Sequence, residues 1–232
     1  IFQDPMTALN PVYSIGFQIG ENLKYHTRLS NKEIKSKSIE LLREMDIPIP
    51  DQRVLEFPHQ FSGGMRQRAM IAMAMACSPK ILIADEPTTA LDVTIQAQIF
   101  ELMDKLKQHH ETAIILITHD MGVVTELADD VVVMYMGNIV ESGSIEEVLR
   151  SPAHPYTKAL LNSIPVLGRG KNQEIKPIRG STPDPLNRPK GCQFMPRCDF
   201  SDDKCLTMPL AVELSETHIT RCWYSDKILQ DE

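Results

Sequence analysis

Two short apolar runs, each followed at once by polar residues, constrain the fold of this chain most strongly. The first run is Ile81–Ala84, which precedes Asp85 and Glu86, and the second is Ala113–Ile117, which precedes Thr118 and His119. Runs of this kind predict parallel strands covered by helices on both faces. In an open α/β sheet, ligands bind outside the carboxyl ends of such strands. We therefore expect these polar residues to line one site.

The residues after the two strands suit a magnesium–nucleotide site. Of two adjacent carboxylates, one can hold Mg²⁺ while the other orients or deprotonates a water. Taken alone, Asp85 and Glu86 would fit a solvated acidic loop better than a site, but the polar end of the second strand reverses that preference. Histidine titrates near neutral pH, so His119 is suited to sensing or polarising a terminal phosphate.

A glycine-rich segment, Phe61-Ser-Gly-Gly-Met-Arg-Gln-Arg68, opens a predicted helix. Ser62 can cap this helix, and Gly63 and Gly64 leave backbone N–H groups open to an anion. The alanines and methionines that follow are good helix formers. A capped core helix would explain Ser-Gly-Gly alone equally well, so the other motifs decide between the two interpretations.

The order of these motifs resembles that of the ATP-binding-cassette (ABC) ATPases. The resemblance makes Ser62, Gly63 and Gly64 the signature loop, Asp85 and Glu86 the end of Walker B, Ala90-Leu91-Asp92 the D-loop, His119 the switch histidine and Gln3 the Q-loop glutamine. It implies that Asp85 and Gln3 hold Mg²⁺, that Glu86 acts on the attacking water, and that Asp92 bridges two cassettes. Met65 departs mildly from the pattern, since glutamine often stands there.

The N-terminal sequence leads to a further expectation. The chain begins Ile1-Phe2-Gln3, and it contains no Gly-x-x-x-x-Gly-Lys-Ser/Thr loop to cradle phosphates. We expect an incomplete P-loop NTPase core of α/β class that lacks its Walker A part and does not hydrolyse ATP as it stands. A net charge of −7 argues against general nucleic-acid binding.

Periodicity and capping patterns predict most of the remaining elements. Helices are expected at Ile15–His26, Lys32–Met45, Thr94–His110, Asp120–Leu127 and Ser144–Leu149. A hairpin is expected from Val131–Tyr135 and Ile139–Glu141 around Gly137-Asn138. We divide the chain into an ATPase domain at 1–150, with a helical subdomain at about 15–77, and an extension at 151–232.

The extension contains four of the five cysteines: Cys192, Cys198, Cys205 and Cys222. Four thiolates can hold Zn²⁺ or an iron–sulfur cluster, although reduced thiols remain an alternative and paired Cys-x-x-Cys motifs are absent. The segment Pro152-Ala-His-Pro-Tyr-Thr-Lys-Ala-Leu160 resembles the C-terminal extension of oligopeptide, dipeptide and nickel importer ATPases. That resemblance favours a [4Fe–4S] cluster. Trp223 is expected to pack over this site, and Cys77 to be a small core residue.

The resemblance implies an ATPase subunit that energises uptake of peptides or a related solute at the cytoplasmic face of the plasma membrane. Its partners would be a second ATPase subunit, identical or related, two transmembrane permease subunits and, indirectly, an external solute-binding protein. Two alternatives are an ABC ATPase of DNA repair or ribosome function and a non-catalytic regulatory or interaction module. The first is disfavoured because coiled-coil insertions and tandem cassettes are absent from the sequence.

Overall fold

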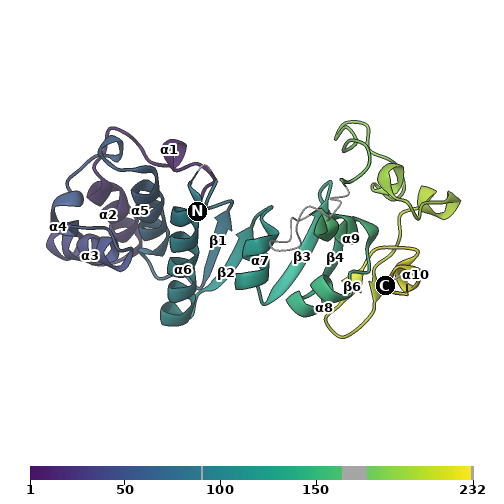
Figure 1. The fold of residues 1–232 in the computed structure, drawn as a ribbon. Helices are drawn as coiled ribbons and strands as arrows, with labels where there is room; N and C mark the ends of the chain where they lie inside the picture. Colours follow the sequence, from purple (N-terminus) through teal and green to yellow (C-terminus); the bar gives the residue numbers. More distant parts are fainter. Residues whose placement is uncertain (90, 164–176, 231–232) are drawn as a thin grey trace. The chain divides into compact units, whose positions relative to one another are not determined.

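The computed structural model describes residues 1–89, 91–163 and 177–230, which form two compact units, residues 1–119 and 120–232 (Figure 1). Each unit is described by itself. Ala90, the first residue of the predicted D-loop, lies outside the described residues. Among the described residues, no helix is both long and apolar enough to cross a membrane.

The first unit combines a small parallel sheet with a group of helices. Strands β1 (Ile81–Asp85) and β2 (Ala113–Ile117) pair in parallel from Ile81 opposite Ala113 to Asp85 opposite Ile117. The helices are α1 (Pro5–Ala8), α2 (Ile15–His26), α3 (Asn31–Glu44), α4 (Pro50–Arg53), the 3₁₀ turn η1 (Pro58–Gln60), α5 (Gly63–Met75) and α6 (Val93–His110).

The helices of the first unit form where local signals and a shared apolar face agree. Ser30 and Glu33 make a reciprocal capping box at the start of α3, which satisfies backbone N–H groups that the helix leaves open. Helices α2, α3 and α5 pack together through fully buried side chains such as Ile19, Leu42 and Ile71. The predicted helical subdomain is therefore built around a core of its own.

Two predictions for the first unit were wrong. The strands alternate in burial, so that Leu82 is buried whereas Ile83 is about half exposed, and only one face of this sheet is covered within the unit. Cys77 is exposed because α5 ends at Met75, which places the cysteine in the turn after the helix rather than on its buried face.

The second unit contains an antiparallel sheet in the order β3-β4-β6-β5. Its elements are α7 (Met121–Leu127), β3 (Asp130–Tyr135), β4 (Asn138–Ser144), α8 (Ile145–Arg150), α9 (Pro155–Asn162), η3 (Met195–Arg197), η4 (Asp203–Leu206), β5 (Val212–Glu213), β6 (Ile219–Thr220) and α10 (Ser225–Leu229). Strands β5 and β6 come from the predicted extension, so the extension adds two short strands beside the β3–β4 hairpin.

The turn of this hairpin lies one residue earlier than predicted. Tyr135 pairs with Asn138, which leaves Met136 and Gly137 as the two turn residues, with φ of 49° and 81°. A two-residue turn with positive φ at both positions matches the right-handed twist of the strands. Asn138 therefore belongs to β4 rather than to the turn.

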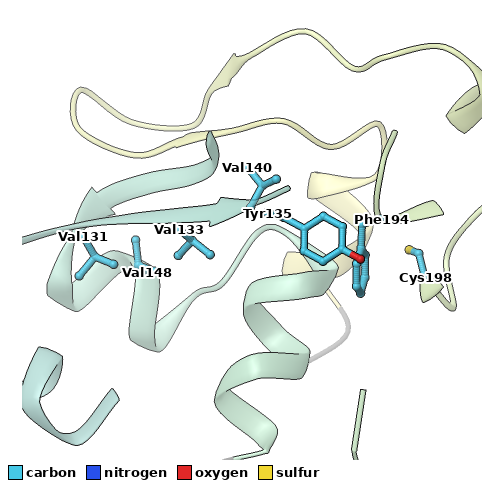
Figure 2. Packing of buried hydrophobic residues seen from close by; sticks show 7 residues of the cluster. All are labelled: Val131, Val133, Tyr135, Val140, Val148, Phe194 and Cys198. Atoms are coloured by element: carbon cyan, nitrogen blue, oxygen red, sulfur yellow. The ribbon is translucent and has the colours of Figure 1, made fainter. Parts of the chain in front are cut away.

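A single apolar cluster joins the hairpin to the extension (Figure 2). The rings of Tyr135 and Phe194 meet edge to face, with centroids 5.3 Å apart. Val148 of α8 is fully buried on the same side, and Cys198 lies at the end of the cluster. Residues from before and after position 150 thus share one core.

Candidate functional site

Backbone hydrogen bonds along β1 bring the N-terminal residues to the predicted site. The amino group of Ile1 donates to Ile83 O at 2.7 Å, and Asp85 N donates to Ile1 O at 3.0 Å. The chain start therefore runs beside β1 on the edge away from β2, which places Gln3 level with the carboxyl end of the strand.

Three side chains from separate parts of the sequence converge on the Glu86 carboxylate. Gln3 Nε2 donates to Oε2 at 2.7 Å, and Thr89 Oγ1 donates to the same oxygen at 2.9 Å. Nδ1 of His119 lies 3.1 Å from Oε1. The structure therefore brings Gln3, Glu86 and His119 together, as the sequence predicted, and it adds Thr89.

The electrostatics of this cluster favour the ionised form of Glu86. Hydrogen bonds from Thr89, His119 and Gln3, in that order of size, lower the pKa of its carboxyl group below the ordinary value. A carboxylate that stays ionised and accepts hydrogen bonds can orient a water molecule or take a proton from it.

The backbone at Glu86 is held in an unusual conformation. Its φ of 43° lies in the left-handed region, which non-glycine residues seldom adopt outside sites that enforce it. Glu86 N donates to Ile117 O at 2.9 Å, so the last residue of β2 fixes this conformation. The strand end turns sharply, and the Glu86 side chain projects towards His119.

Asp85 and Gln3 provide oxygen atoms of the kind that Mg²⁺ prefers. Asp85 is the last residue of β1 and is exposed, while the Gln3 amide carries a carbonyl oxygen beside the nitrogen that binds Glu86. Mg²⁺ is commonly held in proteins by one or two carboxylates together with substrate phosphates. The chemistry of these donors therefore fits the predicted metal.

The predicted signature loop lies at the start of α5, a 13-residue helix. The Ser62 hydroxyl caps the helix by accepting from Met65 N, and both Ser62 and Gly63 are exposed. The first turn presents open backbone N–H groups at the positive end of the helix dipole, which is an arrangement that binds anions. The absence of a side chain at Gly64 also has a packing role, since a Cβ there would lie 2.8 Å from Ile95 Cγ2.

Asp92 has a local role that the sequence motif did not predict. Its side chain caps α6 by accepting from Ile95 N at 3.0 Å, and the residue is exposed. The capping geometry explains an aspartate at this position without reference to a second cassette.

The predicted cysteine site is not supported. Cys192, Cys198, Cys205 and Cys222 line one small pocket together with Trp223, but among the described residues no three His, Cys, Asp or Glu side chains could hold a metal ion. Burial raises the pKa of Cys192, and it raises that of Cys198 to about 11 and that of Cys222 to about 12. The described residues therefore give no support to a zinc or iron–sulfur site at these cysteines. Trp223 lines the same pocket as the cysteines and is itself partly exposed.

Comparison with known proteins identifies the family. A family profile described as "ABC transporter" matches residues 3–89, and one described as "Oligopeptide/dipeptide transporter, C-terminal region" matches residues 140–205. The oligopeptide transport ATP-binding protein AppD of Bacillus subtilis is 51% identical over 224 residues, which cover 96% of this chain and 68% of that protein. The chain belongs to the ABC transporter family. It is an ATPase of the ABC transporter type.

Further relatives agree with this assignment. The dipeptide transport ATP-binding protein DppD of Haemophilus influenzae is 52% identical over 88% of this chain, which corresponds to 62% of that protein. Among solved structures, the ATP-binding cassette MJ0796, determined as a dimer bound to ADP and Pi, matches with a TM-score of 0.55 and 26% identity. That match covers 62% of this chain and 61% of the solved chain. The α/β cassette fold of this ABC ATPase is therefore shared with a solved ABC cassette.

Proposed function

We propose that this chain belongs to the ATP-hydrolysing subunit that energises uptake of peptides, or of a related small solute, through an ABC importer. The observation that carries the proposal is the convergence of Gln3 and His119 on Glu86. Phosphoryl transfer to water depends mostly on positioning and on neutralising charge, and this cluster supplies groups for both.

In this proposal each site residue has a defined part. Asp85 and Gln3 hold Mg²⁺, which neutralises phosphate charge when it is bound. Glu86 orients the attacking water and accepts its proton. His119 contacts the terminal phosphate through its exposed ring, 80% of which is open to solvent.

The signature loop acts on a nucleotide held mainly by a second ATPase subunit, which is identical or related to this one. Ser62, Gly63 and Gly64 contact its terminal phosphate through the Ser hydroxyl and backbone N–H groups, and Asp92 contributes to the interface between the two cassettes. The proposal draws support from the exposed helix start and from the dimeric state of the similar cassette MJ0796.

The remaining partners follow from the relatives named for oligopeptide and dipeptide transport. We assign the subunit to the cytoplasmic face of the plasma membrane, bound to two transmembrane permease subunits that receive solute from an external binding protein. Residues 1–150 form the ATPase domain, and residues 151–232 form the transporter-type extension. The profile match over residues 140–205 supports a transporter-type C-terminal region, although it begins before residue 150.

Turnover also requires a phosphate-binding loop with its lysine, and the 232 residues contain no such motif. We therefore propose that these residues alone do not hydrolyse ATP. A protein that contains both these residues and the phosphate-binding loop is expected to hydrolyse it.

The test compares ATP hydrolysis by these 232 residues with that of the full-length product of the gene. We expect turnover by the full-length protein, and we expect Glu86→Gln to abolish it while ATP binding persists. The matched control is Glu101→Gln, which changes an exposed glutamate on α6 and should leave turnover unchanged. A full-length protein that binds no ATP, or a Glu86→Gln variant that hydrolyses at the normal rate, would favour the non-catalytic interaction module instead.

A further inference from the structure

The turn that follows β1 brings a second functional side chain against Glu86. Thr89 Oγ1 donates to Glu86 Oε2 at 2.9 Å, on the same oxygen that accepts from Gln3. The sequence motifs did not single out Thr89, because an exposed threonine after Asp-Glu-Pro also fits an ordinary turn.

The backbone fixes this contact from both sides. Thr89 N donates to Glu86 O at 3.1 Å, which closes a four-residue turn with Pro87 at its second position, where proline is favoured. Glu86 N is bound to the end of β2, as described above. Beyond the turn, Gln96 Nε2 of α6 donates to Thr88 O at 3.2 Å. The hydroxyl of Thr89 is therefore placed over the carboxylate by a turn attached to both a strand and a helix.

The three partners of Glu86 differ in how they are attached. Gln3 reaches Glu86 from 83 residues away and His119 from 33 residues away, and each belongs to a different segment. Thr89 is three residues away in the same turn. If the segments carrying Gln3 and His119 shift when nucleotide and Mg²⁺ bind, the contact from Thr89 moves with Glu86 and persists.

We propose that Thr89 is a positioning residue for hydrolysis, whose hydroxyl holds the Glu86 carboxylate in the orientation that engages the attacking water. This inference rests on the proposed function, since it requires Glu86 to act on water. Thr89 contacts the carboxylate rather than the nucleotide, so its removal should affect the chemical step more than ATP binding.

The test uses the full-length protein with Thr89→Val, which keeps the shape of the side chain but removes the donor, and Thr89→Ser, which restores the donor. The matched control is Thr88→Val, which removes a hydroxyl from the same turn. The contact of Thr88 with α6 uses its backbone carbonyl, which accepts from Gln96 Nε2, so the substitution keeps that hydrogen bond. Thermal unfolding of each variant checks that the fold is intact.

We expect Thr89→Val to lower kcat about tenfold or more with KM for ATP unchanged, because a hydrogen bond to a charged group is lost. Thr89→Ser should recover most of the rate, and Thr88→Val should match the wild type. The inference is overturned if Thr89→Val keeps the wild-type kcat, if only KM changes, or if Thr89→Ser is equally impaired. Failure of the proposed function would look different. In that case the wild-type protein would not hydrolyse ATP, or Glu86→Gln would not change its rate of hydrolysis, and the inference about Thr89 would fail as well.

Discussion

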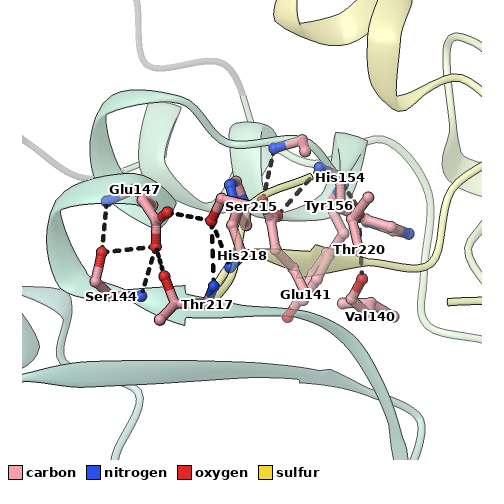
Figure 3. Close-up of polar contacts among 11 residues, drawn as sticks. Val140, Glu141, Ser144, Glu147, His154, Tyr156, Ser215, Thr217, His218 and Thr220 are labelled. Carbon is pink, nitrogen blue, oxygen red and sulfur yellow. Dashed lines mark hydrogen bonds and ion pairs between the residues drawn. The ribbon is translucent and has the colours of Figure 1, made fainter. Parts of the chain in front are cut away.

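Replacing Glu141 with alanine should severely destabilise the second unit. Glu141 is fully buried on β4, where Oε1 accepts from Ala153 N at 2.6 Å and from His218 Nε2 at 2.8 Å (Figure 3). Oε2 accepts from His154 N at 3.1 Å. One carboxylate therefore satisfies two backbone donors before α9 and a ring nitrogen from the extension.

The magnitude follows from what the substitution leaves behind. Three donors lose their acceptor inside the protein, where each unsatisfied donor costs about 1–3 kcal/mol. Breaking a buried pair by removing one partner typically costs about 3–5 kcal/mol in total, since such effects are not additive. We expect Glu141→Ala to lower the free energy of unfolding of this unit by about that amount.

Trp223 offers a specific assay, because it is the single tryptophan of the chain and belongs to the second unit. Its fluorescence during urea titration reports on the unit that contains Glu141. With a urea slope of about 2 kcal/mol per molar, the expected loss shifts the midpoint by roughly 1.5–2.5 M.

The control is Glu146→Ala, which removes a carboxylate from the same unit where it forms an exposed pair with Arg150 at 3.0 Å. Exposed pairs on helices contribute about 0.3–0.5 kcal/mol, so this control should barely move the midpoint. A double-mutant cycle with His218→Ala should give a coupling above about 1 kcal/mol. Equal effects of Glu141→Ala and Glu146→Ala would refute the reasoning.

Three further predictions concern packing, acid stability and capping. Gly64→Ala should destabilise the first unit by about 1–3 kcal/mol in urea unfolding, since the new methyl group lies 2.8 Å from Ile95 Cγ2, and Ile95→Ala should relieve part of this cost. Hydrogen bonds from Ser215, Thr217 and Ser144 lower the pKa of Glu147 from 4.5 to about 2, so its contribution to stability is complete above pH 4.5 and lost as the pH falls towards 2. Glu147→Gln should therefore flatten the acid-unfolding curve in that window, and an unchanged curve would contradict this. Ser30→Ala removes the cap of α3 and should cost about 1 kcal/mol by urea unfolding, whereas Ser36→Ala, at an exposed position inside the helix, should cost much less.

Local structure could be predicted well from the sequence, because its causes lie within a few residues of one another. The bounds of α2 and β2 match the predicted ranges, and α3, which was expected at Lys32–Met45, runs from Asn31 to Glu44. The hairpin turn was misplaced by one residue, since the strong turn signal of Gly137-Asn138 outweighed the less usual left-handed conformation of Met136.

Contacts between distant segments were predicted only where a general rule for parallel sheets or a family pattern supplied them. The meeting of Gln3 with Glu86 follows from the motif order, although no periodicity could bring residues 83 positions apart together. The buried pair of Glu141 and His218 was missed, because a glutamate in an alternating strand looks like a solvent-facing residue. The four cysteines of the extension do line one pocket, but no metal-binding group is found among the described residues, because spacing alone does not fix how the sulfur atoms are arranged.

The close packing of Gly64 against Ile95 has a mechanical consequence. Helix α5 begins at the exposed Ser62, and α6 begins at the exposed Asp92, and the two helices meet near these starts with no room for an additional carbon atom. At the neighbouring Gly63, by contrast, a Cβ would lie 3.5 Å from Leu91 Cδ2, which is an ordinary van der Waals contact. Tightly packed interiors transmit displacement rather than absorb it. A side chain at position 64 would therefore push the starts of α5 and α6 apart, and with them Ser62 and Asp92.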